Sequence, residues 1–316
     1  MSRPEESKLS FWFKWTGVVK IKVVYSLWVL QILLGSWMML LEEDSKREFI
    51  FINDGSTDGS LDLIKSKTKD WKNCEIISQE NRGSAAATNV GIKLAKNKYI
   101  KFLDADDLIL YGATEKLLKI IDSDKNINLV YGLQRKVKDF SKVNLDLKIN
   151  SSDLIKIKDP IKSAMTNSMF NPSQFIVKTK LCKEVGGCDE RIKYSQEYSL
   201  TLRLSLFGEF FRLNQYLAIL PEAAPGQISE KKNNQIYRVS KALEFFLLDN
   251  DRLDLEHKLF AQRRLTGRSL RFARRFAKKK YLFRFLILYL KGFFGVSSNI
   301  NKTCANANEI YEDFLD

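Results

Sequence analysis

The chain has 316 residues, 45% of them apolar and 28% charged, which is typical of a folded protein with one large α/β domain plus an appendage or two modest domains. A single histidine and four scattered cysteines without a C-x-x-C pair argue against a histidine triad, a zinc site and a disulfide framework. The unpaired cysteines fit a reducing compartment. With a single histidine, we expect carboxylates to carry out any catalysis. The net charge of +14 includes a stretch from His257 to Asn308 without an acidic residue, which suggests an anionic partner such as membrane headgroups, nucleic acid or a phosphorylated substrate.

Strands and helices alternate in the first part of the chain. A polar and aromatic leader at 1–16 precedes a predicted strand at 18–25 and an apolar stretch at 27–41 that predicts a buried helix. Further strands are expected at 47–53, 74–79 and 99–103, and helices at 61–69 and 84–96. This rhythm predicts an α/β fold with a mostly parallel sheet flanked by helices, in which ligands bind beyond the carboxyl ends of the strands.

Residues 23–41 also have the length of a membrane span. Lys20 and Lys22 precede this stretch and three acidic residues follow it. The alternative is a core strand followed by a core helix, which we prefer because the alternation of strands and helices needs both elements there.

Two acidic clusters follow predicted strands. Asp104 and Asp106, in FLDADD, are one residue apart and can face one Mg²⁺ or Mn²⁺ ion, which prefers oxygen ligands and shares them with phosphate. The alternative is an acidic turn that caps a helix at 108–122. In NDGSTDGS, Asp54 with Gly55 and Ser56 can present a carboxylate to a base or ribose, or can form an Asx turn before the next helix.

A third motif, ENRGSAAATNVGI, combines a helix start that can attract phosphate with Arg82, which can add a charged contact. With FINDGSTDGS before it and KYIKFLDADD after it, the chain resembles the family 2 glycosyltransferases, which have the GT-A fold of the Rossmann-like type. The resemblance continues more weakly through 185–210 and fades near Pro225. It implies a leader at 1–16, a catalytic domain at 17–225 with an atypical start at 17–47, and a helical extension at 226–316.

The resemblance also implies roles for single residues. Asp54, with Ser56, would bind the nucleobase side of a nucleotide-sugar donor, Asp104 its ribose or sugar, and Asp106 the metal ion. The family usually carries an acidic pair whose second member is the catalytic base, and Glu197 stands at that position. Alternatively, Glu197 is a surface carboxylate that opens a helix at 198–207. Family members invert the anomeric centre by direct displacement.

The start of the domain departs from the family pattern. Tyr25 matches a donor-binding tyrosine, but the proline and asparagine that normally surround it are missing, and the following helix is nearly all apolar. Two functions therefore remain open. One is an inverting, metal-dependent transferase that moves sugar from a UDP-sugar to a glycan or lipid-linked acceptor of the cell envelope. The other is a catalytically impaired relative that serves as a membrane-associated binding or scaffold protein.

The C-terminal stretch 263–295 mixes arginines and lysines with leucine and phenylalanine. Its last part, 281–296, suits a helix that lies in the headgroup plane, and it equally suits a helical pair packed on the catalytic domain. The first interpretation places the protein in the cytoplasm, peripherally at the inner face of the membrane. Nucleic-acid binding is not expected, because no recognition motif accompanies the charge.

Overall fold

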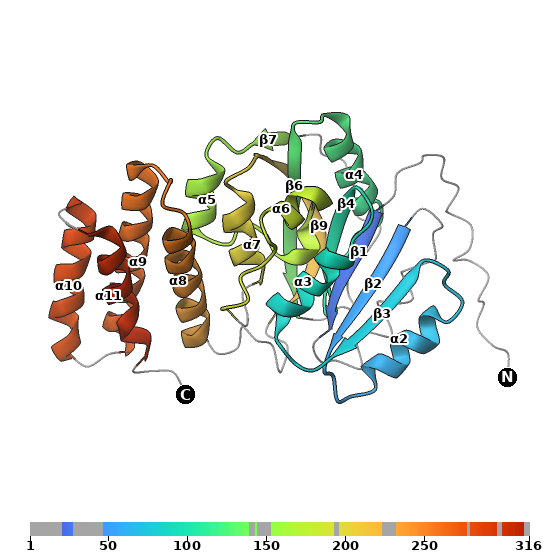
Figure 1. Cartoon of the computed structure of the whole chain (residues 1–316), viewed down its shortest axis with the longest axis horizontal. Coiled ribbons are helices and arrows are strands. Elements are labelled where there is room, and N and C mark those ends of the chain that lie inside the picture. Colours follow the sequence, from blue (N-terminus) through green and yellow to red (C-terminus); the bar gives the residue numbers. More distant parts are fainter. Residues whose placement is uncertain are drawn as a thin grey trace.

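The computed structural model describes residues 21–27, 47–138, 143, 153–192, 196–222, 232–276, 279–295 and 299–312, with only the backbone of 21–27. A nine-stranded sheet with helices on both faces forms most of the molecule, and a group of helices lies beside it at one end (Figure 1). The strands are β1 (Ile21–Leu27), β2 (Arg47–Asp54), β3 (Cys74–Gln79), β4 (Tyr99–Asp104), β5 (Leu108–Ile109), β6 (Ile127–Val137), β7 (Leu154–Lys156), β8 (Phe175–Lys178) and β9 (Glu209–Pro221).

The helices that accompany the sheet are α2 (Ser60–Thr68), α3 (Ser84–Leu94), α4 (Ala113–Ser123), α5 (Pro160–Thr166), α6 (Thr179–Glu184) and α7 (Gln196–Leu204), with a short 3₁₀ turn, η2 (Pro172–Gln174). The helices at the end of the molecule are α8 (Lys232–Asp249), α9 (Leu255–Phe276), α10 (Lys279–Phe294) and α11 (Ile300–Glu312). The order of strands across the sheet is β3-β2-β1-β4-β8-β6-β9-β5, and β7 also pairs with β9.

The half of the sheet that carries the predicted motifs is parallel. Strands β3, β2, β1 and β4 all run in one direction, as the alternation of strands and helices predicts. In β2, Phe49 and Phe51 pack on the α2 side with Ile64, while Ile50 and Ile52 pack with Ala87 of α3. Both faces of β2 are therefore covered, which explains why its sequence is a continuous apolar run.

The other half of the sheet is mixed, which adds antiparallel strands to the mostly parallel sheet that the sequence predicts. Strand β8 is antiparallel to both β4 and β6, and β5 and β7 are antiparallel to β9, although β6 and β9 are parallel. The prediction rested on residues 18–103, where successive strands are joined by crossover helices, and only such connections require parallel neighbours. The predicted helix at 108–122 is also divided: strand β5 comes first, and Gly112 in the left-handed conformation precedes α4.

The predicted first strand is present, and it lies at the centre of the parallel half. Strand β1 pairs with β2 on one side and with β4 on the other. The predicted leader at 1–16 and most of the predicted helix at 27–41 lie outside the described residues. Among the helices that the structure describes, none combines the length and the apolar content needed to cross a membrane.

The C-terminal helices share a hydrophobic core with helices that accompany the sheet. Tyr198 and Leu202 of α7 belong to one buried cluster with Leu243 of α8, Leu265 of α9 and Ala307 of α11. The sequence left open a helical group packed on the catalytic domain, and this packing is present. The predicted domain boundary near 225 falls in a stretch outside the described residues.

Candidate active site

The acidic loop after β4 is the centre of the candidate site. Asp104 is the last residue of β4, and a turn closed by a 3.2 Å hydrogen bond from the Asp107 N–H to the Asp104 carbonyl follows it. Asp107 is buried, while Asp104 and Asp106 remain partly exposed. Burial and the charges of Asp107, Asp106 and Glu197 raise the pKa of Asp104 well above its usual value. The cluster thus has an excess of negative charge.

Asp107, whose role the sequence did not predict, faces inward from the same loop. Burial and the charge of Asp106 raise the pKa of its carboxyl well above its usual value. Its Oδ2 atom is buried and has no hydrogen-bond partner among the described residues. A buried carboxylate oxygen without a donor is costly, so this oxygen is suited to a cation or a donor from a ligand.

A buried lysine supports the acidic loop from below. Lys101 of β4 donates hydrogen bonds from Nζ to the carbonyls of Phe102 (2.7 Å) and Ser173 (2.6 Å). Burial lowers the pKa of Lys101 to about 7, although the charges of Asp107 and Asp104 oppose this change. The Ser173 hydroxyl in turn accepts a hydrogen bond from the Asp104 N–H at 3.1 Å. Lys101 and η2 therefore hold the loop in place.

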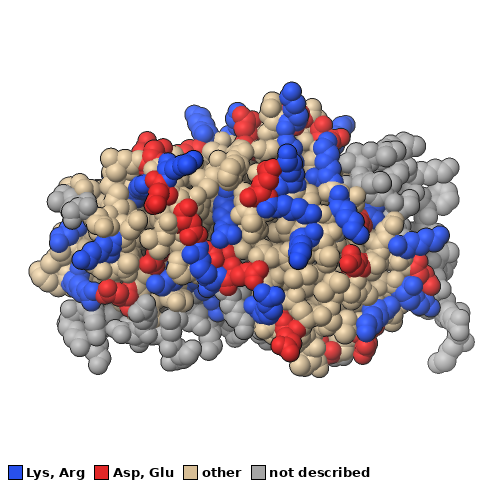
Figure 2. Space-filling model, in the orientation of Figure 1, with Lys and Arg blue, Asp and Glu red and all other residues tan. Residues whose placement is uncertain are grey.

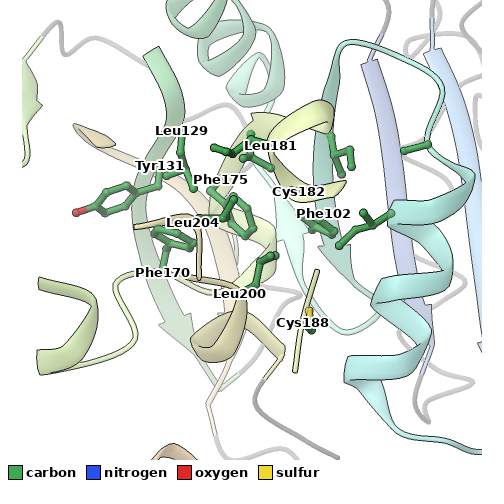
Figure 3. Close-up of a cluster of buried hydrophobic side chains, with 14 of the residues drawn as sticks. Phe102, Leu129, Tyr131, Phe170, Phe175, Leu181, Cys182, Cys188, Leu200 and Leu204 are labelled. Carbon is green, nitrogen blue, oxygen red and sulfur yellow. The ribbon is translucent and has the colours of Figure 1, made fainter. Parts of the chain in front are cut away.

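Glu197 comes from a distant part of the chain and lies close enough to Asp104 for its charge to raise the pKa of that residue. It belongs to the first turn of α7, and burial raises its own pKa, while a hydrogen bond from its own N–H lowers it. Leu200 and Leu204 of α7 pack with Phe102 of β4 and Phe175 of β8 in one hydrophobic cluster (Figure 3). This cluster fixes α7 against the strand that carries the acidic loop.

Asp54 occupies the end of β2, and its carboxylate holds the following β3–α3 connection. Its Oδ1 accepts hydrogen bonds from Gln79 Nε2 (2.8 Å) and the Arg82 N–H (2.9 Å), and its Oδ2 accepts one from the Gly83 N–H (2.8 Å). The sequence predicted that Asp54 contacts the nucleobase. That contact stays a prediction, and the structure adds a positioning role that links two of the three motifs.

The turn after Asp54 needs its glycine. Gly55 has φ of +74°, and a Cβ at this position would lie 2.8 Å from the backbone nitrogen of Asn81. Ser56 donates its N–H to Asn53 Oδ1 at 3.1 Å, and Asn53 Nδ2 donates to Ser78 Oγ at 2.9 Å. Ser56 is partly exposed beside the parallel strand ends, and its contact with a donor stays a prediction.

Arg82 lies on the rim of the site, where it makes an ion pair with Glu190 at 2.8 Å. Glu190 also accepts a hydrogen bond from Asn89 of α3 at 2.8 Å. The three side chains connect the β3–α3 motif to the segment that leads to Glu197. The side chain of Arg82 is 57% exposed, so it can exchange Glu190 for a phosphate, and its predicted contact with the donor is untested.

Tyr25 lies in the central strand of the parallel half. Its register partners are Phe51 of β2 and Leu103 of β4, so its backbone lies between the strands that carry Asp54 and Asp104. The parallel strands end at the same edge, and neighbouring strands are about 4.8 Å apart. The side chain of Tyr25 lies outside the described part of the chain, so its predicted role stays a prediction.

The acidic loop fits a divalent cation of the kind that the sequence predicted. Within the described ranges, no three His, Cys, Asp or Glu side chains form a preformed metal cage. A magnesium ion, however, is commonly held by one or two carboxylates together with substrate phosphates, and keeps several waters. Asp106 with Asp104 supplies such oxygens, and the buried Oδ2 atom of Asp107 has no hydrogen-bond partner among the described residues.

The sheet, the parallel strand ends and the acidic loop define an α/β protein with an acidic site beyond the carboxyl ends of its parallel strands. Residues 31–186, just under half of the chain, match the model for glycosyl transferase family 2. The match includes Asp54, Arg82, Asp104 and Asp106, and it ends before Glu197.

The curated relatives match only part of this chain, and only part of their own length is matched. The chain is 29% identical over 168 residues to a chondroitin synthase of Pasteurella multocida, which is 53% of this chain and 17% of that protein. It is 32% identical over 143 residues to the glycosyltransferase GlyG of Streptococcus pneumoniae, which is 43% of this chain and 47% of that protein. The matches span between 11% and 47% of the length of such relatives.

Solved structures show the same fold. The structure is similar to residues 1–349 of TarS of S. aureus, with a TM-score of 0.61, 14% identity and coverage of 94% of this chain and 91% of that chain. A TarS structure in complex with UDP-GlcNAc has a TM-score of 0.63 at 15% identity, and covers 87% of this chain and 81% of that one. These similarities confirm the fold that the resemblance implied.

Proposed function

We propose that the protein is an inverting glycosyltransferase that moves a sugar from a nucleotide-diphosphate donor to a hydroxyl group. The observation that carries this proposal is the packing of α7, which carries Glu197 in its first turn, against β4, which ends in the acidic loop. The loop would provide carboxylates for a cation, and that cation would bind the donor diphosphate. Glu197 would provide a further carboxylate from α7.

The donor is proposed to be a UDP-sugar bound along the carboxyl ends of β1, β2 and β4. The match to the model for glycosyl transferase family 2 supports a nucleotide sugar, and the similar TarS structures were solved with UDP-GlcNAc and with UDP. Asp106, with Asp104, would hold Mg²⁺ or Mn²⁺, which when bound neutralises the diphosphate as it leaves. Arg82 would release Glu190 and contact the same diphosphate.

Glu197 is proposed to act as the base. It removes the proton from the acceptor hydroxyl as the acceptor oxygen bonds to the anomeric carbon and the bond from that carbon to the diphosphate oxygen breaks. Burial raises the pKa of Glu197, and a base is most effective when its pKa approaches the working pH. A single displacement of this kind inverts the anomeric centre and needs no covalent sugar–enzyme intermediate.

The acceptor is proposed to be a glycan or a lipid-linked glycan of the cell envelope, extended at the inner face of the cell membrane. The basic C-terminal helices support peripheral contact with an anionic surface, because His257 to Asn308 contains no acidic residue. Under this proposal the protein works in the cytoplasm.

Calorimetric titration with UDP, with and without Mn²⁺, tests the donor site. We expect Mn²⁺-dependent binding that Asp106→Asn abolishes and that Asp62→Asn, at an exposed position of α2, leaves unchanged. If the folded protein gives no heat with UDP, TDP or GDP, the transferase proposal fails, and a catalytically impaired binding protein becomes the better description.

A further inference from the structure

Helix α10 presents a continuous apolar face to solvent. Phe283 is 70% exposed and Phe294 is 69% exposed, values that are unusual for side chains of this size. The exposed apolar residues of this helix are Phe283, Leu286, Ile287, Leu290, Phe293 and Phe294. Their spacing of three and four residues places them on one side of the helix. We refer to these six residues as the outer face of α10.

The opposite side of α10 is packed closely on α9. The outer face is therefore the side of this helix that points away from the protein. Phe285 is buried. At Gly292, a Cβ would lie 2.6 Å from Thr266 Oγ1 of α9, so no larger residue fits there. Tyr289 crosses α9 at Gly267, where a Cβ would lie 3.6 Å from its ring. The two contacts fix the rotation of α10 about its axis.

Exposed basic side chains lie in α10 and at the end of the helix before it. Arg271, Arg274 and Arg275, in the last turns of α9 just before α10, are exposed, as is Lys291 of α10 itself. Figure 2 shows lysine and arginine side chains beside uncharged surface at the end of the molecule that holds α10. A second copy of the same face would bring like charges together, whereas anionic headgroups would complement them.

We propose that the outer face of α10 inserts into the headgroup and acyl boundary of an anionic lipid bilayer, with the arginines at the end of α9 on the lipid phosphates. A helix with an apolar face and a basic flank lies in the plane of such an interface. The helix has 16 residues, which suits a position along the surface. This inference deepens the membrane contact under the proposed function by naming the surface that makes it.

Vesicle flotation of the full chain tests the surface. The probes are vesicles of phosphatidylcholine alone and of phosphatidylcholine mixed with phosphatidylglycerol. We expect binding to the mixed vesicles that falls about tenfold or more when Phe283→Ser or Phe294→Ser removes one inserted ring. Phe207→Ser is the matched control, because Phe207 is 56% exposed and lies after α7, away from α10, and it should bind as the wild type.

A second pair of variants tests the charge. The double variant Arg274→Gln, Arg275→Gln should weaken binding to the mixed vesicles and make the remaining binding less sensitive to salt, while Lys69→Gln, just after α2, should not. Unchanged vesicle binding in all the α10 variants would overturn the proposal and assign binding to another segment. The proposal would also be overturned if the wild-type protein did not bind vesicles but formed dimers that Phe283→Ser dissociates.

Donor titration on the same variants separates this inference from the proposed function. Loss of vesicle binding with normal UDP binding shows that the variants are folded and that the surface is specific. Vesicle binding without any nucleotide binding would support the proposed lipid surface and would contradict the transferase proposal.

Discussion

Among single residues, Glu197 bears most directly on the proposed reaction. We predict that Glu197→Gln lowers turnover about 10²- to 10⁴-fold while UDP affinity stays unchanged, because an amide fills the same space but accepts no proton. Single-turnover sugar transfer and calorimetry on the same preparation measure the two quantities. Glu184→Gln, at a half-exposed carboxylate of α6, is the control. Equal losses of turnover and UDP affinity would mean that Glu197 binds the donor and is not the base.

Lys101 gives a second prediction at this scale. Replacing it with methionine removes the cost of burying an amine, but it leaves two buried carbonyls without donors and takes a cation from below Asp104 and Asp107. We expect Lys101→Met to destabilise the protein by about 1–3 kcal/mol. Mn²⁺ should raise the melting temperature of the variant more than that of the wild type. Equal shifts would show that Lys101 does not balance the carboxylates, and Lys69→Met serves as the exposed control.

The sequence predicted the site residues that depend on local spacing and missed those that depend on tertiary contact. Asp104 and Asp54 could be found because each is the last residue of an apolar strand, and Asp106 because it lies in the loop directly after Asp104. Ser173 could not be found, since it meets Lys101 from 72 residues further along the chain. The only local signal was a lysine in the otherwise apolar run of β4, and that signal does not name its partners.

At the scale of elements, the sequence pattern located β2, α2, β3, α3 and β4 to within two residues, while β1 begins three residues later than predicted. The predicted strand at 74–79 coincides with β3, and the predicted helix at 84–96 is α3, which ends at Leu94. Strand β5 was missed because two residues are too few to show an alternation of apolar and polar side chains. Its partner, β9, lies more than 100 residues further along the chain. The sequence did not predict that β8 is antiparallel to β4. The direction of a strand depends on its neighbours in the sheet, and the four residues of β8 do not encode it.

The junction between α5 and α9 gives a prediction about pH. Asp159 caps α5 by accepting from the Lys162 N–H, and His257 in the first turn of α9 contacts both Asp159 and Asp254. Burial lowers the pKa of His257, but the two carboxylates outweigh it and the net change is upward from 6.5. Because the folded state holds the proton more tightly, this stabilisation is complete below pH 6.5 and is lost as the pH rises through the raised pKa.

We therefore expect the difference in unfolding free energy between wild type and His257→Gln to be largest below pH 6.5 and to shrink above it. Urea titrations at a series of pH values measure this difference. The variant Asp159→Asn should remove part of the same pH dependence. A difference that stays constant across the range would show that His257 contributes through packing alone.

For the whole molecule, the buried cluster that joins α5 and α7 to α8, α9 and α11 implies that the C-terminal helices and the site fold together. Leu265 of α9 is fully buried in this cluster with Tyr198 and Leu202, which follow Glu197 in α7. Leu265→Ala should cost about 2–5 kcal/mol, since the cavity it leaves cannot close completely. The sequence left packing of this segment on the catalytic domain open beside a membrane contact, because its basic and apolar residues are compatible with both.

Hydrogen exchange on Leu265→Ala decides whether that dependence is real. If the molecule unfolds as one unit, exchange should rise in α7 and β4 as well as in α8, α9 and α11, and by a similar free energy in each. Leu255→Ala, at a 65% exposed position of the same helix, should leave exchange unchanged. Faster exchange confined to the C-terminal helices would make them a separate unit, and Glu197 would then keep its place without them. Faster exchange throughout would mean that the helices carrying the proposed lipid surface also hold the proposed base against the acidic loop.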